Sequence, residues 1–247
     1  MAISETLVIA ILFFVAAALY ASVGHAGASA YLAVMGLFSF APGVMKPTAL
    51  ALNILVAAVA TLKFYQAGLF SWSFFWPFAI ASVPAAFIGG AIALPAQWYK
   101  IVVGVVLLYA AAWMFRSSFK PQAPAATGPP RWAALLTGAA IGFLSGLTGV
   151  GGGIFLSPLI LYLGWADTRS TSGVAAPFIL VNSIAGLLGH LSSVDQLPTN
   201  IPLWGAAALL GGWIGASYGS KHAPPPVLRQ LLSIVLVVAG AKLIFGG

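Results

Sequence analysis

The chain has 247 residues, of which 61% are hydrophobic and only 5% are charged, and its mean hydropathy is +1.05. Because an ordinary soluble domain carries about 25% charged residues, this composition excludes a soluble enzyme and a disordered tail, and it indicates a membrane protein. The formal charge of +7 comes from ten Lys and Arg residues scattered singly along the chain, which excludes a basic nucleic-acid-binding patch and points to membrane orientation.

Ten apolar segments follow one another along the chain, and each is a candidate membrane-spanning helix. The first is interpreted as a retained helix and not as a cleaved signal peptide, because it carries Glu5 where a basic region would be needed. Two of the ten are short and follow glycine-rich breaks, so they are either full spans or re-entrant half-helices. The segments are 5–23, 28–40, 48–66, 72–94 and 98–116 in the first half, and 132–148, 151–165, 171–191, 201–219 and 226–245 in the second.

The two groups of five segments resemble each other, which predicts one membrane domain built from two repeats. A stretch rich in Pro and Gly, 118–131, separates them and is interpreted as an exposed linker, so that the repeats are 1–117 and 132–247. The matching positions keep their order along the chain, with offsets between 123 and 129. They are Gly24-His-Ala-Gly-Ala28 with Gly149-Val-Gly-Gly-Gly153, Lys46-Pro-Thr48 with Arg169-Ser-Thr171, Asn53 with Asn182, Phe87 with Trp213, and Tyr99 with Leu228.

The distribution of positive charge favours ten spans. With ten spans and the N-terminus outside, seven cations lie inside, and three, namely Lys46, Lys100 and Lys242, lie in outer loops. If the two short segments are re-entrant, the cations divide evenly between the two sides. Since Lys and Arg prefer cytoplasmic loops, we expect ten spans, a cytoplasmic linker and both termini outside. Five spans per repeat then makes the two repeats inverted, a common plan of transporters that bind substrate near the midplane, where broken helices meet.

The most specific feature is the glycine-rich run that includes Gly149, Gly151, Gly152 and Gly153. These glycines would break a membrane helix, and unwound backbone is tolerated in a membrane only where it is buried in protein or lines a polar cavity. Free amide N–H groups and the N-terminal end of the next helix would form an anion site. The alternative is close helix packing through small residues. The similar break in the first half favours the anion site.

His25 lies inside that first-half break, between Gly24 and Gly27. It is a candidate for substrate contact or for carrying a proton, and the alternative is a hydrogen-bonded structural residue. Its counterpart is Val150, so its role is not duplicated in the second half. His190, near the end of the eighth segment, is interpreted as structural or interfacial. Proton coupling would have to use one of these two histidines, because carboxylates are missing from the apolar segments.

Polar side chains at the starts of the third and eighth segments are further candidates. The hydroxyls of Thr48, Thr171 and Ser172 could donate to an anion, although hydroxyls at such positions commonly cap the helix. Arg169 could bind an oxyanion through two N–H groups. Its alternatives are a role in membrane orientation or an ion pair with Asp167.

Asn53 and Asn182 occupy matching positions inside apolar runs. A buried amide in a membrane needs a partner, so each either lines the substrate site or ties helices together. Their symmetric placement favours the first interpretation.

The three carboxylates of the chain, Glu5, Asp167 and Asp195, all lie at the ends of predicted segments. A cation transporter usually needs carboxylates inside the membrane, so their position argues against a cation as the transported ion. The sequence also has no paired carboxylates, no Ser–His–Asp order, no metal-ligand spacing and no ATP-binding loop. We therefore expect neither an enzyme nor a cofactor or metal site.

The Gly-Val-Gly-Gly-Gly-x-x-x-x-Pro run at 149–158, the Arg-Ser-Thr-Ser run at 169–172 and the repeated halves together resemble the TauE/SafE family of membrane proteins. The likeness covers almost the whole chain. It implies export of a sulfur-containing anion such as sulfite, sulfoacetate or a related organosulfonate. The first-half copy of the motif is degenerate, with His25 and Ala28 where the family pattern is richer in glycine, so symmetric half-sites are not implied.

The sequence thus predicts an all-α polytopic protein of the cell (inner) membrane, with two inverted five-helix repeats and glycine-broken helices near the midplane. We expect it to be a secondary transporter of a small sulfur-containing anion, with the lipid bilayer and the anion as its partners and no nucleic acid. The alternatives are an anion channel, an uptake carrier for another small anion, and a non-transporting membrane partner protein. The candidate substrate-binding residues are Gly24, His25, Gly27, Thr48, Asn53, Gly149, Gly151, Gly152, Gly153, Arg169, Thr171, Ser172 and Asn182.

Overall fold

The computed structural model describes residues 3–117, 128–191, 198–222 and 226–245, and this part of the chain is all-helical. Each of the ten predicted segments is a helix, so the predicted all-α polytopic class is confirmed. The helices are α1 (Ile3–Ala21), α2 (Ala28–Leu37), α3 (Pro42–Gln66), α4 (Trp72–Ala91), α5 (Ala96–Ser117), α6 (Arg131–Thr148), α7 (Gly153–Tyr162), α8 (Thr168–His190), α9 (Ile201–Gly219) and α10 (Pro226–Phe245).

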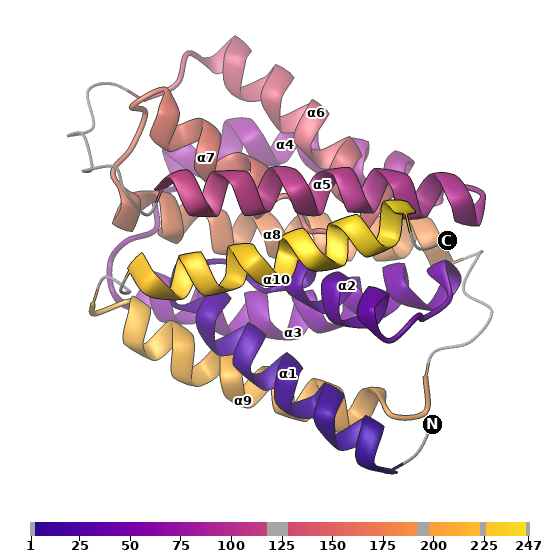
Figure 1. Ribbon diagram of the computed structural model, residues 1–247. Helices are drawn as coiled ribbons and strands as arrows, with labels where there is room; N and C mark the ends of the chain where they lie inside the picture. Colours follow the sequence, from indigo (N-terminus) through magenta and orange to yellow (C-terminus); the bar gives the residue numbers. More distant parts are fainter. Residues whose placement is uncertain (1–2, 118–127, 192–197, 223–225, 246–247) are drawn as a thin grey trace.

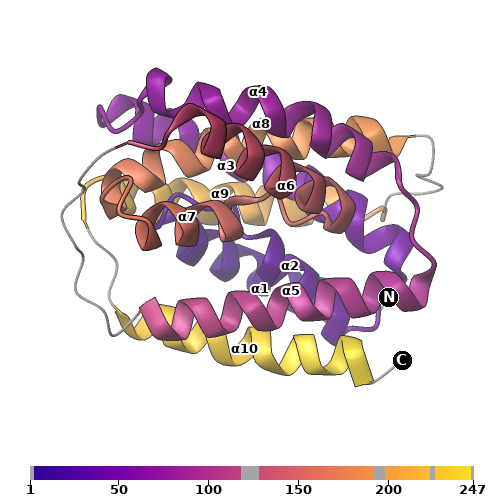
Figure 2. The same cartoon turned by 90° about the horizontal axis from the view of Figure 1, so that it is seen from above.

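Successive helices run back and forth along a common axis, so the molecule has two distinct ends (Figures 1 and 2). We call the end where α1 begins and α10 finishes the terminal end. The end where α5 finishes and α6 begins is the linker end. The chain therefore passes between the two ends repeatedly, as a multi-pass membrane protein requires.

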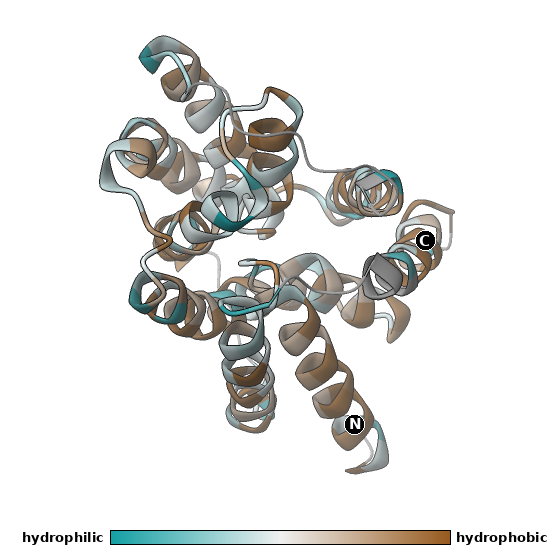
Figure 3. Cartoon of the chain, turned by 90° about the vertical axis from the view of Figure 1, so that its left-hand side faces the viewer, coloured by the Kyte–Doolittle hydropathy of each residue, from teal (hydrophilic) through white to brown (hydrophobic). Residues whose placement is uncertain are grey.

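Five helices, α1, α3, α4, α5 and α8, are long and apolar enough to cross a membrane. Hydrophobic residues also cover many outward faces of the bundle, as expected for contact with lipid (Figure 3). The two segments expected to be short, α2 and α7, have ten residues each, or about 15 Å. Neither can cross a hydrocarbon core of about 30 Å as a helix alone.

The two halves of the chain interlock through glycine-lined helix contacts. The first helix of each half packs along the fourth helix of the other half, α1 on α9 and α6 on α4. A Cβ atom added at Gly211, Gly215 or Gly219 would collide with the backbone of α1, and one at Gly138, Gly142 or Gly146 with that of α4. Small residues at every fourth position thus let these backbones touch. The third helices, α3 and α8, pack against each other between them.

The glycine-rich breaks separate α1 from α2 and α6 from α7. Gly24 and Gly27 adopt φ values of 75° and 100°, and Gly149, Gly151 and Gly152 lie between 81° and 84°. Glycine adopts this left-handed backbone readily and other residues do so at a cost. Gly24 lies against Ser172 of α8, and Gly149 lies against Lys46 of α3. Each break therefore rests on the third helix of the other half.

The structure corrects the predicted start of the third segment. α3 begins at Pro42 and not near residue 48, so Lys46 is in the second turn of the helix and not in an outer loop. Pro42 stands at the first helical position, where its fixed φ favours the helix and its missing N–H is not needed. Lys46 is only 3% exposed. Its ammonium group is therefore inside the protein at the terminal end.

Candidate functional site

The N-terminal ends of the two short helices meet in the interior. His25, just before α2, forms a hydrogen bond of 2.8 Å between Nε2 and the Ser157 hydroxyl in the second turn of α7. A Cβ atom added at Gly153, the first residue of α7, would lie 3.1 Å from His25 Cδ2. The first N–H groups of a helix lack intrahelical partners, and its N-terminal end carries partial positive charge. Two such ends converge here.

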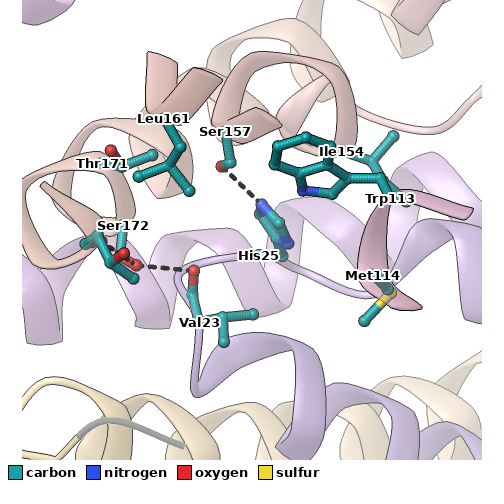
Figure 4. Close-up of a pocket in the computed structure, with 10 residues that line it drawn as sticks. Val23, His25, Trp113, Met114, Ile154, Ser157, Leu161, Thr171 and Ser172 are labelled. Carbon is teal, nitrogen blue, oxygen red and sulfur yellow. Dashed lines mark hydrogen bonds between the residues drawn. The ribbon is translucent and has the colours of Figure 1, made fainter. Parts of the chain in front are cut away.

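A pocket opens beside this convergence, between the first break, α5, α7 and the start of α8 (Figure 4). Its cavity volume is about 60 Å³, which is room for a few waters or a small anion. The polar groups of its lining side chains are one imidazole, one indole N–H and four hydroxyls, and no carboxylate lines it within the described residues. The lining residues are Val23, His25, Trp113, Met114, Ile154, Ser157, Leu161, Thr168, Thr171 and Ser172.

Two neighbouring hydroxyls of α8 have different roles in this pocket. The Ser172 hydroxyl is 2.9 Å from the Val23 carbonyl and 3.0 Å from that of Thr168, so its proton fastens α8 to the first break. The Thr171 hydroxyl is buried, lines the pocket and has no hydrogen-bond partner. A buried hydroxyl without a partner is costly. Thr171 therefore keeps an unused donor at the wall of the pocket.

Asn53 and Asn182 are fully buried but do not line the pocket. Asn53 Nδ2 lies 3.3 Å from both the Val150 carbonyl and the Ser183 hydroxyl, which joins the second break to α3 and α8. Asn182 Nδ2 donates to the Phe178 carbonyl at 2.8 Å, within its own helix. In this conformation both side-chain amides donate their hydrogen bonds to protein groups.

The matched basic residues Lys46 and Arg169 make the same kind of contact. Lys46 Nζ donates to the carbonyls of Gly90 and Ile92 at 2.8 and 3.3 Å, at the C-terminal end of α4. Arg169 Nη2 donates to the Ser220 carbonyl at 3.0 Å, at the C-terminal end of α9. Each basic side chain thus caps the fourth helix of its own half. The guanidinium of Arg169 lies on the surface and not in the pocket.

Asp167 is the N-cap of α8, and the suggested ion pair between Asp167 and Arg169 is wrong. One carboxylate oxygen accepts the Ser170 backbone N–H at 2.9 Å, and the other accepts the Ser170 hydroxyl at 3.0 Å. The backbone hydrogen bond from Ser170 is the main reason why the pKa of this carboxyl falls below its ordinary value. Capping explains the acidic residue at this position without an ion pair.

The structure brings part of the predicted residue set together. His25, Thr171 and Ser172 line one pocket, and the glycines at 24, 27, 149 and 151–153 shape the two breaks beside it. Thr48, Asn53 and Asn182 lie on α3 and α8 outside the pocket lining. Sequence reasoning did not select Ser157, Thr168 or Trp113. A signal existed for Ser157, a small polar residue one turn after the glycine run.

Sequence similarity to known proteins identifies the chain as a membrane transporter. Residues 9–243 match the family described as "Sulfite exporter TauE/SafE". The probable membrane transporter protein y4hK of Sinorhizobium fredii (strain NBRC 101917 / NGR234) is 45% identical over 245 residues, covering 98% of this chain and 99% of the relative. The probable membrane transporter protein YunE of Bacillus subtilis (strain 168) is 27% identical over 112 residues, 43% of this chain and 39% of the relative. No solved structure matches. The family match covers nearly the whole sequence, and the chain belongs to the TauE/SafE family of membrane transporters.

Proposed function

We propose that the protein is a secondary transporter that moves a small sulfur-containing anion, such as sulfite or an organosulfonate like sulfoacetate, out of the cell. The observation that carries this proposal is the pocket at the convergence of α2 and α7. It combines the N-terminal ends of α7 and α8, the His25 imidazole and the unpartnered Thr171 hydroxyl, and none of its lining side chains is acidic. Such an environment favours an anion over a cation.

The chemistry of the anion fits this set of donors. The oxygens of a sulfite or sulfonate group accept hydrogen bonds from hydroxyls, from imidazole N–H and from backbone amides, and hydrogen bonds to a charged group are stronger than neutral ones. The family description, sulfite exporter, supports the same class. An inside-negative potential drives an anion outward with about 2.3 kcal/mol per charge per 100 mV, so export needs no further coupling.

The architecture supports an inverted repeat of 1–117 and 132–247 around the linker 118–131. α1 with α9 and α6 with α4 form equivalent contacts. Each break contacts the first turns of the third helix of the other half, and the two basic caps are equivalent. In transporters with inverted repeats, rocking of one repeat against the other exposes a central site alternately to each side.

Uptake of labelled anions into proteoliposomes tests the proposal. Sulfite, sulfoacetate and taurine should be compared with sulfate, phosphate and simple carboxylates, in liposomes with and without the protein. We expect saturable flux for one or more of the sulfite and sulfonate group. Flux of carboxylates or phosphate alone would overturn the substrate class. Fast flux that does not saturate would indicate a channel, and absence of flux for every anion would favour a non-transporting membrane partner.

A further inference from the structure

A buried cation lies at the end of the molecule opposite the pocket. The Lys46 side chain is 3% exposed, and its ammonium group bonds to the Gly90 and Ile92 carbonyls, with no carboxylate partner among the described residues. These bonds fasten α3 to the C-terminal end of α4 at the terminal end. A buried ammonium is costly unless it is paired or fully hydrogen-bonded, so the contact is stable only while those carbonyls stay in reach.

His190, the last residue of α8, packs against the same end of α4 that Lys46 binds. It is 5% exposed, and its ring faces the backbone of Gly90 without a well-formed hydrogen bond at either ring nitrogen. Buried polar groups are nearly always hydrogen-bonded in proteins, so a buried ring with no well-formed hydrogen bond needs an explanation. Lys46 binds the carbonyl of the same Gly90, so the two side chains meet at one residue of α4. The pocket does not use either residue.

We propose that Lys46 and His190 form a proton-responsive gate that closes the terminal end of the transport path. The proposal rests on the transport function above. In the equivalent position of the other half, Arg169 makes its helix-capping contact on the surface of the linker end, where α8 borders the pocket. The same joint is therefore buried at one end and exposed at the other, as expected for a protein that opens its two ends in turn.

A proton on His190 would release this gate. The protonated ring would place a second positive charge beside the Lys46 ammonium, and like charges repel strongly where water is excluded. Separation of the two would pull Lys46 from the α4 carbonyls and loosen α3 from α4 and α8. Within the described residues of the helices packed on α8, the other ionisable side chains are Lys63 and Tyr65 of α3, Arg131 of α6 and Tyr162 of α7, all at the linker end.

The chain provides a natural reporter position directly below the gate. Leu50 is one helical turn after Lys46 on the same face of α3, and it is fully buried. A Cβ atom at Gly186, one turn before His190, would lie 3.6 Å from the Leu50 side chain. The protein contains no cysteine, so Leu50→Cys is a single reactive thiol in an unreactive background. Leu161→Cys, in the pocket lining, reports on the other end.

The experiment measures labelling of these thiols by a membrane-impermeant thiosulfonate, applied from each side of sealed vesicles, while the pH on the terminal side varies. At about pH 7.5 we expect Leu50→Cys to be protected and Leu161→Cys to react. At about pH 4.5, well below the ordinary pKa of histidine, labelling of Leu50→Cys from the terminal side should rise at least about tenfold, beyond the change of the reagent with a free thiol.

Two variants test whether His190 and Lys46 produce this response. His190→Gln should abolish the acid-induced labelling of Leu50→Cys, whereas Lys46→Met should expose this thiol at both pH values. Arg169→Met, which removes the equivalent cap at the other end, should leave Leu50→Cys protected at neutral pH. Reaction of Leu161→Cys from the linker side alone, as in the parent protein, shows that each variant keeps its fold.

Other results would overturn the gate. Labelling of Leu50→Cys that is independent of pH, or acid-induced labelling that survives His190→Gln and disappears with His25→Gln, contradicts it. Because labelling needs no substrate, the gate and the proposed anion can fail separately. A correct labelling pattern without anion flux would reject only the proposed substrate, and flux without the pattern would reject only the gate.

Discussion

At the scale of single residues, the pocket offers an anion neutral donors rather than fixed positive charge. Arg169, the cation nearest in sequence to the pocket hydroxyls, donates to Ser220 on the surface. The Ser172 hydroxyl donates to backbone carbonyls. The Thr171 hydroxyl has no hydrogen-bond partner in the protein. Dipoles attract an anion without holding it as tightly as an ion pair, which suits a carrier that must release its substrate.

Thr171→Val therefore tests the binding role of one hydroxyl. The substitution keeps the shape and removes a donor, and a hydrogen bond to a charged group contributes about 1.5–3 kcal/mol. We expect anion affinity to fall about 10- to 100-fold, measured by calorimetry or by ligand-induced thermal shift. The melting temperature without ligand should not fall, because the hydroxyl has no partner in the protein. Thr61→Val, which removes another buried unpartnered hydroxyl away from the pocket, should leave the affinity unchanged.

At the scale of elements, the glycine breaks combine backbone conformation with close approach. Gly151 has φ of +81°, and a Cβ atom there would collide with the Asn53 amide and lie 2.9 Å from Ile179 Cγ2. Gly164 has φ of +65° but nothing within 4 Å. The two positions share the left-handed backbone and differ in the space around them.

Comparison of Gly151→Ala with Gly164→Ala separates these two effects. A left-handed non-glycine residue costs about 1–2 kcal/mol, and overpacking adds about 1–3 kcal/mol. Gly164→Ala should show only the first cost and retain transport. Gly151→Ala should be clearly less stable in thermal unfolding, and it should lose flux because Asn53 must move from the second break. Equal behaviour of the two variants would mean that the break is only a turn.

The cap of α8 has a pH dependence of its own. Asp167→Ala should destabilise the protein by about 0.5–2 kcal/mol, whereas Asp167→Asn, also a good cap, should cost much less. The Ser170 hydrogen bonds lower the pKa of the folded carboxyl. The extra stability from its charge is therefore present above the unfolded pKa of about 3.9 and is lost as the pH falls through the folded pKa. Unfolding in detergent across pH values should show the gap to Asp167→Ala constant near neutrality and shrinking only below about pH 4. A gap that closes between about pH 8 and 6 would instead implicate a histidine.

At the scale of the molecule, hydropathy was enough to predict all ten helices, because each apolar run needs a helix to satisfy its backbone in lipid. Glycine clustering likewise predicted both breaks. The sequence could not reveal the contacts between distant residues. The bond from His25 to Ser157 joins positions 132 residues apart, and the burial of Lys46 depends on the end of α4 lying beside α3. The roles of Asn53 and Asn182 also depended on tertiary partners, which spacing does not show.

The distribution of charge over the two ends predicts the orientation of the protein. Arg116, Arg131 and Lys221 are at the linker end, with Lys63 and Arg169, whereas the terminal end has Lys100 and Lys242 besides the buried Lys46. The positive-inside rule therefore predicts that the linker end is cytoplasmic.

The cysteine-free background allows a direct test of this orientation. In intact cells, an impermeant thiol reagent should label Ile3→Cys, at a site 82% exposed at the terminal end, and should reach Trp132→Cys, at a site 67% exposed at the linker end, only after permeabilisation. The opposite pattern would reverse the orientation and turn the pocket outward. With the predicted orientation, the pocket receives its anion from the cytoplasm, and His190 faces the side on which a respiring cell accumulates protons. Opening of the gate by external protons and outward movement of the anion would then act in the same direction.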